Sequence, residues 1–159
     1  MDTEFNTNSK AIIIGMTDTG EKIPAASGRI STQPGTALEI LEASKDPQKN
    51  ASLISKVTRS GHNSTIEHTV FNLAFQNVSV FVEQFIIEFR LASFTVKSRR
   101  YVDFGALGYY TPRFASKSVQ DRYTAHMNYL YSEYNSFIEA GIPKEDARFL
   151  LPYSLYSNF

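Results

Sequence analysis

The segment EFRLASFTVKSRRY spans residues 88–101 and begins where a helical pattern of apolar residues ends. It brings together four basic side chains, Arg90, Lys97, Arg99 and Arg100, with no carboxylate after Glu88. Arginine presents a planar fork of donors that matches phosphate or carboxylate, and lysine adds a point charge. The segment therefore predicts a local anion-binding site, with a basic loop that only faces water as the alternative.

The residues just before this segment predict a strand followed by a helix. Apolar and polar residues alternate over 67–78, which is typical of a strand. Ser79 is placed to cap a helix, and four apolar residues follow at helical spacing. We expect these four residues to face the core: Val82, Phe85, Ile86 and Phe89.

Farther from the segment, the patterns predict one strand and several helices. The apolar run Ala11–Ile14 predicts a buried strand. Leu38 and Leu41 should face inward from a helix that opens near Thr36, with Ile40 as a further candidate. A second helix should begin at Asp46 and Pro47 and stop at Gly61. The longest should span residues 116–140, with a short one after Pro143. The fold class is therefore α+β, with helices packed on a largely antiparallel sheet.

The composition favours one domain over residues 1–159, because this length is usual for a single domain. The formal net charge is zero, so no general attraction to nucleic acid or to an anionic membrane is expected. The first residues lack the order of a signal peptide and no apolar run is long enough to span a bilayer, so a cytoplasmic location is the default expectation. The absence of cysteine excludes disulfides, zinc–thiolate sites and cysteine nucleophiles.

Three other kinds of site are disfavoured by the motifs. His62, Glu67 and His68 suggest a metal site, but Ser64 stands where the inverted zincin order needs its first histidine. Tyrosines follow the basic segment, as in proteins that bind single strands, but the zero net charge argues against nucleic acid. Neither a dinucleotide-binding glycine fingerprint nor a phosphate-loop signature is present. We therefore expect no metal site and no Rossmann or phosphate-loop nucleotide site.

Three motifs, taken in order, resemble the flavin-dependent thymidylate synthases (thymidylate synthase complementing proteins). GHNSTIEH at residues 61–68 is similar to that family's Gly-His-x-Ser-x-x-Glu-His segment. Residues 88–101 keep the spacing of the family's Arg-His-Arg-x-x-Ser-x4-Ser-x-Arg-Tyr motif, and ARFLLP at residues 147–152 is the third match. The resemblance implies the family's α+β fold and covers nearly the whole chain.

The resemblance also implies an activity and a set of ligands. Family members methylate dUMP to dTMP, with methylenetetrahydrofolate, FAD and NADPH taking part, and they form homotetramers. By resemblance, His62, Ser64 and Arg90 would contact FAD, whereas Ser98 and Arg100 would hold dUMP, with Arg148 approaching from a neighbouring subunit. No catalytic residue is assigned.

The chain departs from the family pattern at several positions. Glu88 and Phe89 replace the first arginine and the histidine of the second motif, and the sequence ends at Phe159, before the family's later catalytic arginine. These departures leave two functions to weigh. One is a thymidylate synthase, and the alternative is a catalytically inactive paralogue that serves as a nucleotide-binding or structural subunit of a hetero-oligomer.

Overall fold

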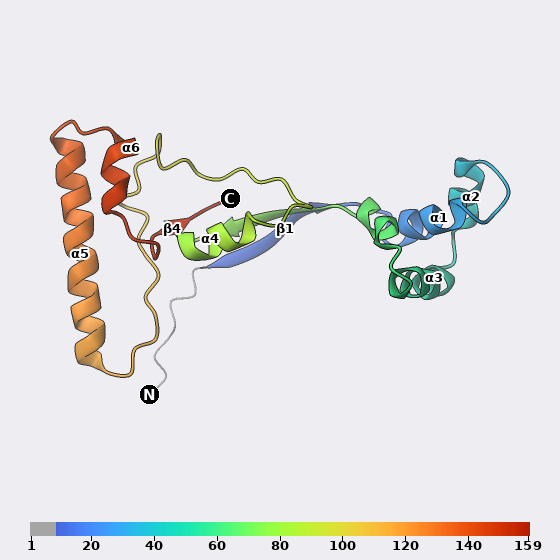
Figure 1. The fold of residues 1–159 in the computed structure, drawn as a ribbon, viewed down its shortest axis with the longest axis horizontal. Helices are drawn as coiled ribbons and strands as arrows, with labels where there is room; N and C mark the ends of the chain where they lie inside the picture. Colours follow the sequence, from blue (N-terminus) through green and yellow to red (C-terminus); the bar gives the residue numbers. More distant parts are fainter. Residues whose placement is uncertain (1–8) are drawn as a thin grey trace. The chain divides into compact units, whose positions relative to one another are not determined.

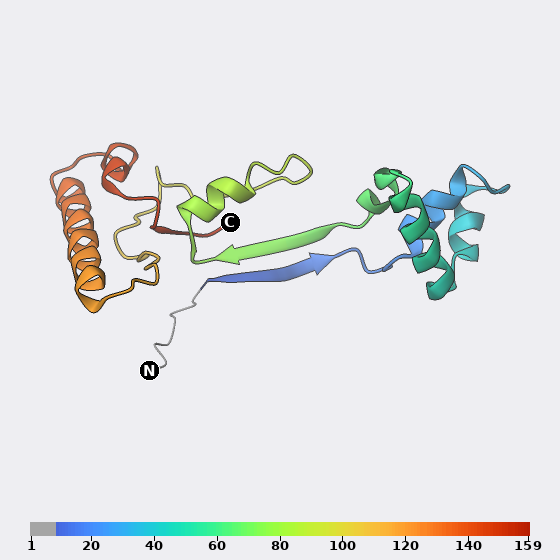
Figure 2. The ribbon, with the colours of Figure 1, turned by 60° about the horizontal axis from the view of Figure 1, so that its bottom comes forward.

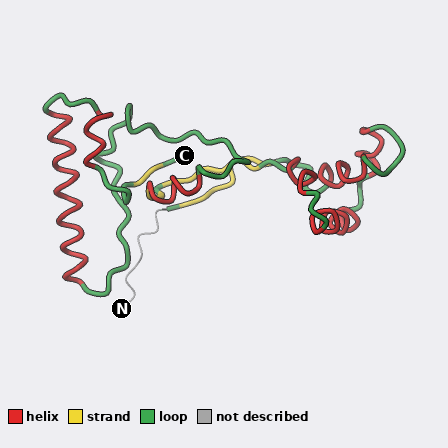
Figure 3. The backbone as a smooth tube through the Cα atoms, viewed as in Figure 1, coloured by secondary structure: helices red, strands yellow, loops and turns green. Residues whose placement is uncertain are grey.

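The computed structural model describes residues 9–159, which divide into two compact units. Unit 1 holds the described residues up to Ile12 together with Ala74–Phe159, and unit 2 holds Ile13–Leu73. The elements are, in order, β1 (Lys10–Met16), α1 (Lys22–Ile30), α2 (Ala37–Ala43), α3 (Pro47–Arg59), η1 (Asn63–His68), β2 (Phe71–Gln76), β3 (Val78–Ser79), α4 (Val80–Ile86), α5 (Lys117–Glu139), α6 (Lys144–Ala147), η2 (Arg148–Leu150) and β4 (Tyr156–Ser157) (Figures 1 and 3). Helices and small sheets together confirm the α+β class. The expectation of one domain over residues 1–159 stays a prediction.

Helix α3 begins and ends where the sequence predicts. The Asp46 carboxylate accepts hydrogen bonds from the backbone N–H groups of Gln48 and Lys49, both at 3.1 Å, and Pro47 occupies the first helical position. Gly61 follows the last turn with φ of +84°, a conformation that a side chain would strain. The helix is therefore fixed at both ends by local sequence.

Helix α2 buries Ile40, but it exposes Leu38, which was expected to face inward. A reciprocal cap forms at its start, because Thr36 Oγ1 accepts from Glu39 N and Glu39 Oε2 accepts from Thr36 N. Ile40 is 3% exposed, but Leu38 is 73% exposed, so the inward prediction for Leu38 was wrong. Leu38 therefore lies on the exposed side of this two-turn helix.

Helix α1 was not predicted, and it forms the centre of unit 2. It packs against α2, α3 and η1 and buries Ala25 and Ala26. Pro24 lies in its first turn, where the missing N–H group costs no intrahelical hydrogen bond. At its other end Arg29 Nη1 donates to Ser44 Oγ and to Asn50 Oδ1, both at 2.7 Å. Small residues and buried polar partners thus take the place of an apolar stripe.

Strands β1 and β2 form a two-stranded antiparallel ribbon, as their opposed arrows in Figure 2 show. The prediction of a buried first strand was wrong, because Ile13 is 56% and Ile14 is 68% exposed. Phe71 and Leu73 of β2 are also about half exposed, at 52% and 46%. Neither face of this two-stranded ribbon is fully covered by the rest of the chain, and both faces carry exposed apolar side chains.

The core of unit 1 forms where α5 packs on the chain's C-terminal segment. It contains Val80, Phe104, Met127, Tyr131 and Leu155. Strands β3 and β4 pair antiparallel, with Val78 opposite Ser157. On α5, the Tyr131 hydroxyl donates to the Gly108 carbonyl at 2.7 Å, so this core tyrosine has a polar partner. Helix α6 and η2 lie beside α5 (Figure 1).

Helix α4 turns the opposite face inward from the one predicted. Ser79 caps it as expected, because its hydroxyl accepts from Val82 N at 3.3 Å. However, Val82, Phe85 and Phe89 are 39%, 63% and 58% exposed, so the core prediction for them was wrong. The buried residues are Val80 and Glu83. An ion pair of Glu83, described next, holds this face against the unit.

Candidate functional site

A recess of about 240 Å³ lies in unit 1 and is lined by residues of α4, of the connection between α4 and α5, and of the chain around η2. We call it the arginine recess, because its polar lining consists of Gln84, Arg99 and Arg148. The rest of its lining is mostly apolar and includes Val80 and Leu155, two residues of the core. Two cations in a recess with a mixed polar and apolar lining favour an anionic ligand that has an apolar part.

Glu83 holds Arg99 in place. Arg99 Nη1 donates to Glu83 Oε2 at 3.1 Å, and Arg99 Nη2 donates to Glu83 Oε1 at 2.8 Å. The Glu83 side chain is 1% exposed, whereas that of Arg99 is 21% exposed. Burial alone would raise the pKa of Glu83, but the hydrogen bonds and charge of Arg99 outweigh it and lower that pKa. Glu83 is therefore ionised at neutral pH and fixes the guanidinium at the recess.

Arg148 supplies the second cation of the recess from η2. Its guanidinium carbon lies 5.3 Å from the centre of the Phe149 ring, which is itself exposed. Among residues 9–159, no ion pair is found for Arg148. Its charge is therefore not compensated by a carboxylate of the described chain, which suits a residue that meets an anion.

Ser98 and Arg100, the other residues proposed to hold dUMP, flank Arg99 in the sequence but are not among the residues that line the recess. Their side chains contact other parts of the chain. Arg100 Nε donates to Glu145 Oε2 at 2.9 Å in an exposed ion pair, and Ser98 Oγ accepts from Arg100 N at 3.2 Å. Lys144 Nζ also donates to the Tyr101 carbonyl at 3.2 Å. The segment that carries Ser98 and Arg100 is thereby attached to α6.

The three residues proposed to contact a flavin lie in different units. His62 precedes η1 and Ser64 lies within it, both in unit 2 and both exposed, whereas Arg90 is exposed after α4 in unit 1. The structure thus brings Arg148 and Arg99 into one recess. His62 and Ser64 lie close together at the start of η1. No side-chain hydrogen bond within residues 9–159 occupies His62, Ser64 or Arg90.

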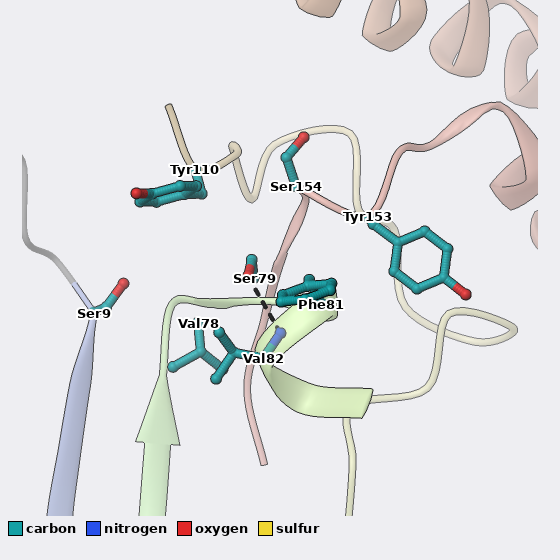
Figure 4. A pocket seen from close by; sticks show the side chains of 8 residues that line it. All are labelled: Ser9, Val78, Ser79, Phe81, Val82, Tyr110, Tyr153 and Ser154. Carbon is teal, nitrogen blue, oxygen red and sulfur yellow. Dashed lines mark hydrogen bonds between the residues drawn. The ribbon is translucent and has the colours of Figure 1, made fainter. Parts of the chain in front are cut away.

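A larger hollow of about 690 Å³ also lies in unit 1, and it is apolar. Figure 4 shows Tyr110 and Ser154 on one side of it and Val78 and Val82 on the other. The remaining lining residues are Ser9, Ser79, Phe81 and Tyr153, so no charged side chain lines it. Tyr153 also lines the arginine recess. This apolar hollow suits a ring system or a packed side chain better than a phosphate.

Sequence reasoning missed the ion pair of Arg99 and Glu83 at the recess. Arg99 was recognised only as part of the basic segment, and Arg100 was favoured because it matches a motif position. The available signal was the one carboxylate in α4 that falls on the same helical face as Val80. Polar residues on a buried helix face are rare unless they are paired, so Glu83 implied a partner.

Two kinds of feature are absent from residues 9–159. No cluster of three or more His, Cys, Asp or Glu side chains there could hold a metal ion. No helix in the same part of the chain is both long and apolar enough to cross a membrane.

Comparison with known proteins places these features in a family. The model of the family described as thymidylate synthase complementing protein matches residues 13–159. The flavin-dependent thymidylate synthase of Thermotoga neapolitana is 32% identical over 122 residues, which cover 72% of this chain and 56% of that protein. The one from Saccharolobus solfataricus is 25% identical over 152 residues, covering 92% and 56%. This chain therefore spans little more than half the length of these relatives.

A solved structure has the same fold. It is a UMP/dUMP methylase, PolB from Streptomyces cacaoi, crystallised with 5-Br dUMP. It aligns with a TM-score of 0.78 at 21% identity, covering 95% of this chain and 70% of that one. The likeness confirms the fold expected from the three sequence motifs.

Proposed function

The chain belongs to the thymidylate synthase complementing protein family, and from this premise we propose that it binds dUMP and takes part in its reductive methylation to dTMP. In this reaction methylenetetrahydrofolate donates the carbon, reduced FAD supplies the hydride, and NADPH reduces the flavin again. The protein's own part is to hold and orient these molecules.

The observation that carries the proposal is the position of Arg148 in the arginine recess. Arg148 is the family-motif arginine of ARFLLP, and it lines a recess that also has apolar lining residues. Each charge-assisted hydrogen bond from such a group to phosphate contributes about 1.5–3 kcal/mol. A nucleotide with a charged phosphate and a flat base suits this arrangement.

The donor chemistry of three exposed residues fits a flavin nucleotide. His62 and Ser64 offer an imidazole and a hydroxyl to the polar groups of the cofactor, and Arg90 offers a cation to its phosphates. Glu88 opposes this fit, since a carboxylate stands where the family carries an arginine. We expect FAD to bind, but less tightly than to relatives that keep the arginine.

We also propose that the chain works as an oligomer, either a homotetramer or a hetero-oligomer. Apolar side chains that a stable monomer would cover are exposed on the β1–β2 ribbon and on α4. They include Ile14, Phe71, Phe81 and Phe85, which are all more than half exposed. A second chain would bury them.

A second function is favoured by the substitutions Glu88 and Phe89. The chain would then be an inactive paralogue that keeps the nucleotide site and serves as a subunit for a catalytic partner. The synthase and the nucleotide-binding paralogue both bind dUMP and differ only in turnover, whereas a purely structural subunit would not need to bind it.

Two measurements on the same preparation separate these possibilities. Calorimetry with dUMP tests binding, and incubation with dUMP, methylenetetrahydrofolate, FAD and NADPH tests for dTMP. Binding with dTMP formation supports the synthase, and binding without it supports the inactive subunit. The absence of dUMP binding would refute the synthase and the nucleotide-binding subunit, and would favour a purely structural subunit.

A further inference from the structure

The apolar hollow of unit 1 has no role in the proposed function. Its volume of about 690 Å³ is within the range of pockets that hold small molecules, and its lining residues all belong to the same unit. None of the described residues that line it is charged. An ion would lose its water there without gaining a partner of opposite charge. The hollow therefore favours an uncharged ligand.

Aromatic side chains supply much of the surface of the hollow. Figure 4 shows the rings of Tyr110 and Phe81 nearly edge-on and on different sides of it. No ring contact joins these two residues within residues 9–159, and both are accessible, since Phe81 is 71% and Tyr110 is 48% exposed. The buried Val78 adds an aliphatic wall. A flat aromatic ring gains more from such a lining than a branched aliphatic group does.

Two serine hydroxyls in the lining leave one donor and one acceptor for a ligand. Ser79 Oγ accepts from Val82 N at 3.3 Å, and its O–H group has no acceptor among residues 9–159. Ser9 Oγ donates to the Asn77 carbonyl, so its oxygen is left to accept. An apolar side chain from a second chain would bury both groups without pairing them, which costs free energy. A heterocycle with a carbonyl and an N–H group would pair both.

We propose that the hollow binds an uncharged, flat heteroaromatic ring that carries a carbonyl acceptor and an N–H donor. The ring stacks on Phe81, with its carbonyl toward Ser79 and its N–H group toward Ser9. This site is independent of the proposed function, because it uses neither the arginine recess nor the ligand of that recess. It also agrees with the proposed oligomer, since an aromatic ring has two faces and a second chain can cover the face of Phe81 that is turned away from the hollow.

The probe is 4-quinolone, a neutral bicycle that carries its carbonyl and its N–H group on opposite edges of one ring. Titrated into ¹⁵N-labelled protein, it should shift the backbone signals of Phe81 and Tyr110 to saturation. Phe81→Leu keeps an apolar side chain but removes the flat ring, so it should raise the dissociation constant about three- to tenfold. Tyr129→Leu is the matched control, because Tyr129 is similarly exposed on α5 and does not line the hollow. It should leave the dissociation constant unchanged.

Two related compounds test the polarity of the site. N-methyl-4-quinolone lacks the donor and should bind about three- to tenfold more weakly than 4-quinolone. Ser9→Ala should weaken the binding of 4-quinolone by a similar factor and leave that of N-methyl-4-quinolone unchanged. Kynurenate adds a carboxylate to the same ring, and it should shift the Phe81 and Tyr110 signals with at least about tenfold lower affinity, because the lining offers no cation. Equal affinities of 4-quinolone and kynurenate at these signals would overturn the inference.

Three further results would also overturn it. One is the absence of any shift at Phe81 and Tyr110 with about 10 mM 4-quinolone, a concentration at which a fragment of this size should bind. Another is a folded Phe81→Leu variant that binds 4-quinolone as the unmodified chain does. The third is binding to the monomer but not to an associated form detected by sedimentation velocity, because a second chain would then fill the hollow. Calorimetry with dUMP on the same samples reports separately on the proposed function.

Discussion

Glu83 and Arg99 form a two-point ion pair between a carboxylate that is 1% exposed and a guanidinium 16 residues later. The pair joins α4 to the basic segment that carries Ser98 and Arg100. The pair also explains the orientation of α4. The face with Val80 and Glu83 is held against unit 1, whereas the face with Phe85 is exposed.

Arg99→Ala should lower the free energy of unfolding by about 3 kcal/mol, because it leaves Glu83 buried and unpaired. Urea denaturation followed by circular dichroism measures this difference. Arg122→Ala, at an exposed position, should change it by less than about 0.5 kcal/mol. Equal stability of Arg99→Ala and the unmodified chain would mean that water reaches Glu83.

The ion pair should also make stability depend on pH. The folded pKa of Glu83 lies below its ordinary value of 4.5, so the pair contributes fully above pH 4.5. The contribution is lost as the pH falls through the lowered pKa. The free energy of unfolding should therefore fall more steeply below that pH for the unmodified chain than for Glu83→Gln. Parallel curves for the two proteins would contradict this assignment.

Glu145→Gln tests whether Arg100 contacts the nucleotide. The substitution removes the exposed partner of Arg100, and a freed Arg100 should lower the dissociation constant of dUMP about two- to fivefold. Arg100→Ala should raise it by the equivalent of about 1.5–3 kcal/mol. Glu139→Gln, on α5, is the control for the change in net charge. If neither Glu145→Gln nor Arg100→Ala alters dUMP binding, Arg100 is not a contact residue.

Phe85→Glu should weaken self-association at least about tenfold, because it puts a charge into the exposed apolar face of α4. Sedimentation velocity over a range of concentrations measures the change. Tyr129→Glu is the control, since Tyr129 is similarly exposed, at 62%, on α5. A monomeric unmodified chain would be evidence against the proposed oligomer.

The double substitution Glu88→Arg/Phe89→His should strengthen FAD binding before it restores turnover. It replaces a carboxylate by a cation near the proposed phosphate contacts of Arg90, which reverses the sign of the interaction. Flavin fluorescence quenching measures the affinity, and dTMP formation measures the turnover. Unchanged affinity would place the flavin away from residues 88–90.

Local signals predicted the ends of the helices well. Asp46 and Pro47 at the start of α3, Ser79 at α4 and Ser116 at α5 act within one turn of their own position. A cap depends on neighbours in sequence, so a single sequence is sufficient to recognise it. The α+β class followed from these boundaries, but α1, which carries no apolar stripe, was not predicted.

The direction in which each helix faces was harder to predict. An apolar stripe such as Val82–Phe85 indicates that this helix face packs against another surface, but not whether that surface belongs to the same chain or to a second one. The partner of Arg99 was not visible either, because Glu83 lies in another element. Arg148 lines a recess together with a second cation, but the ligand contacts of all the proposed site residues, His62 and Ser64 included, stay predictions.

The division of the chain has a consequence for the order in which it folds during synthesis. Unit 2 is one continuous stretch, but unit 1 needs residues on both sides of it. When unit 2 has left the ribosome, β3 still lacks β4, its partner near the other end of the chain. Until Tyr156 and Ser157 are made, the α4 region is therefore an unfinished surface that a chaperone can bind.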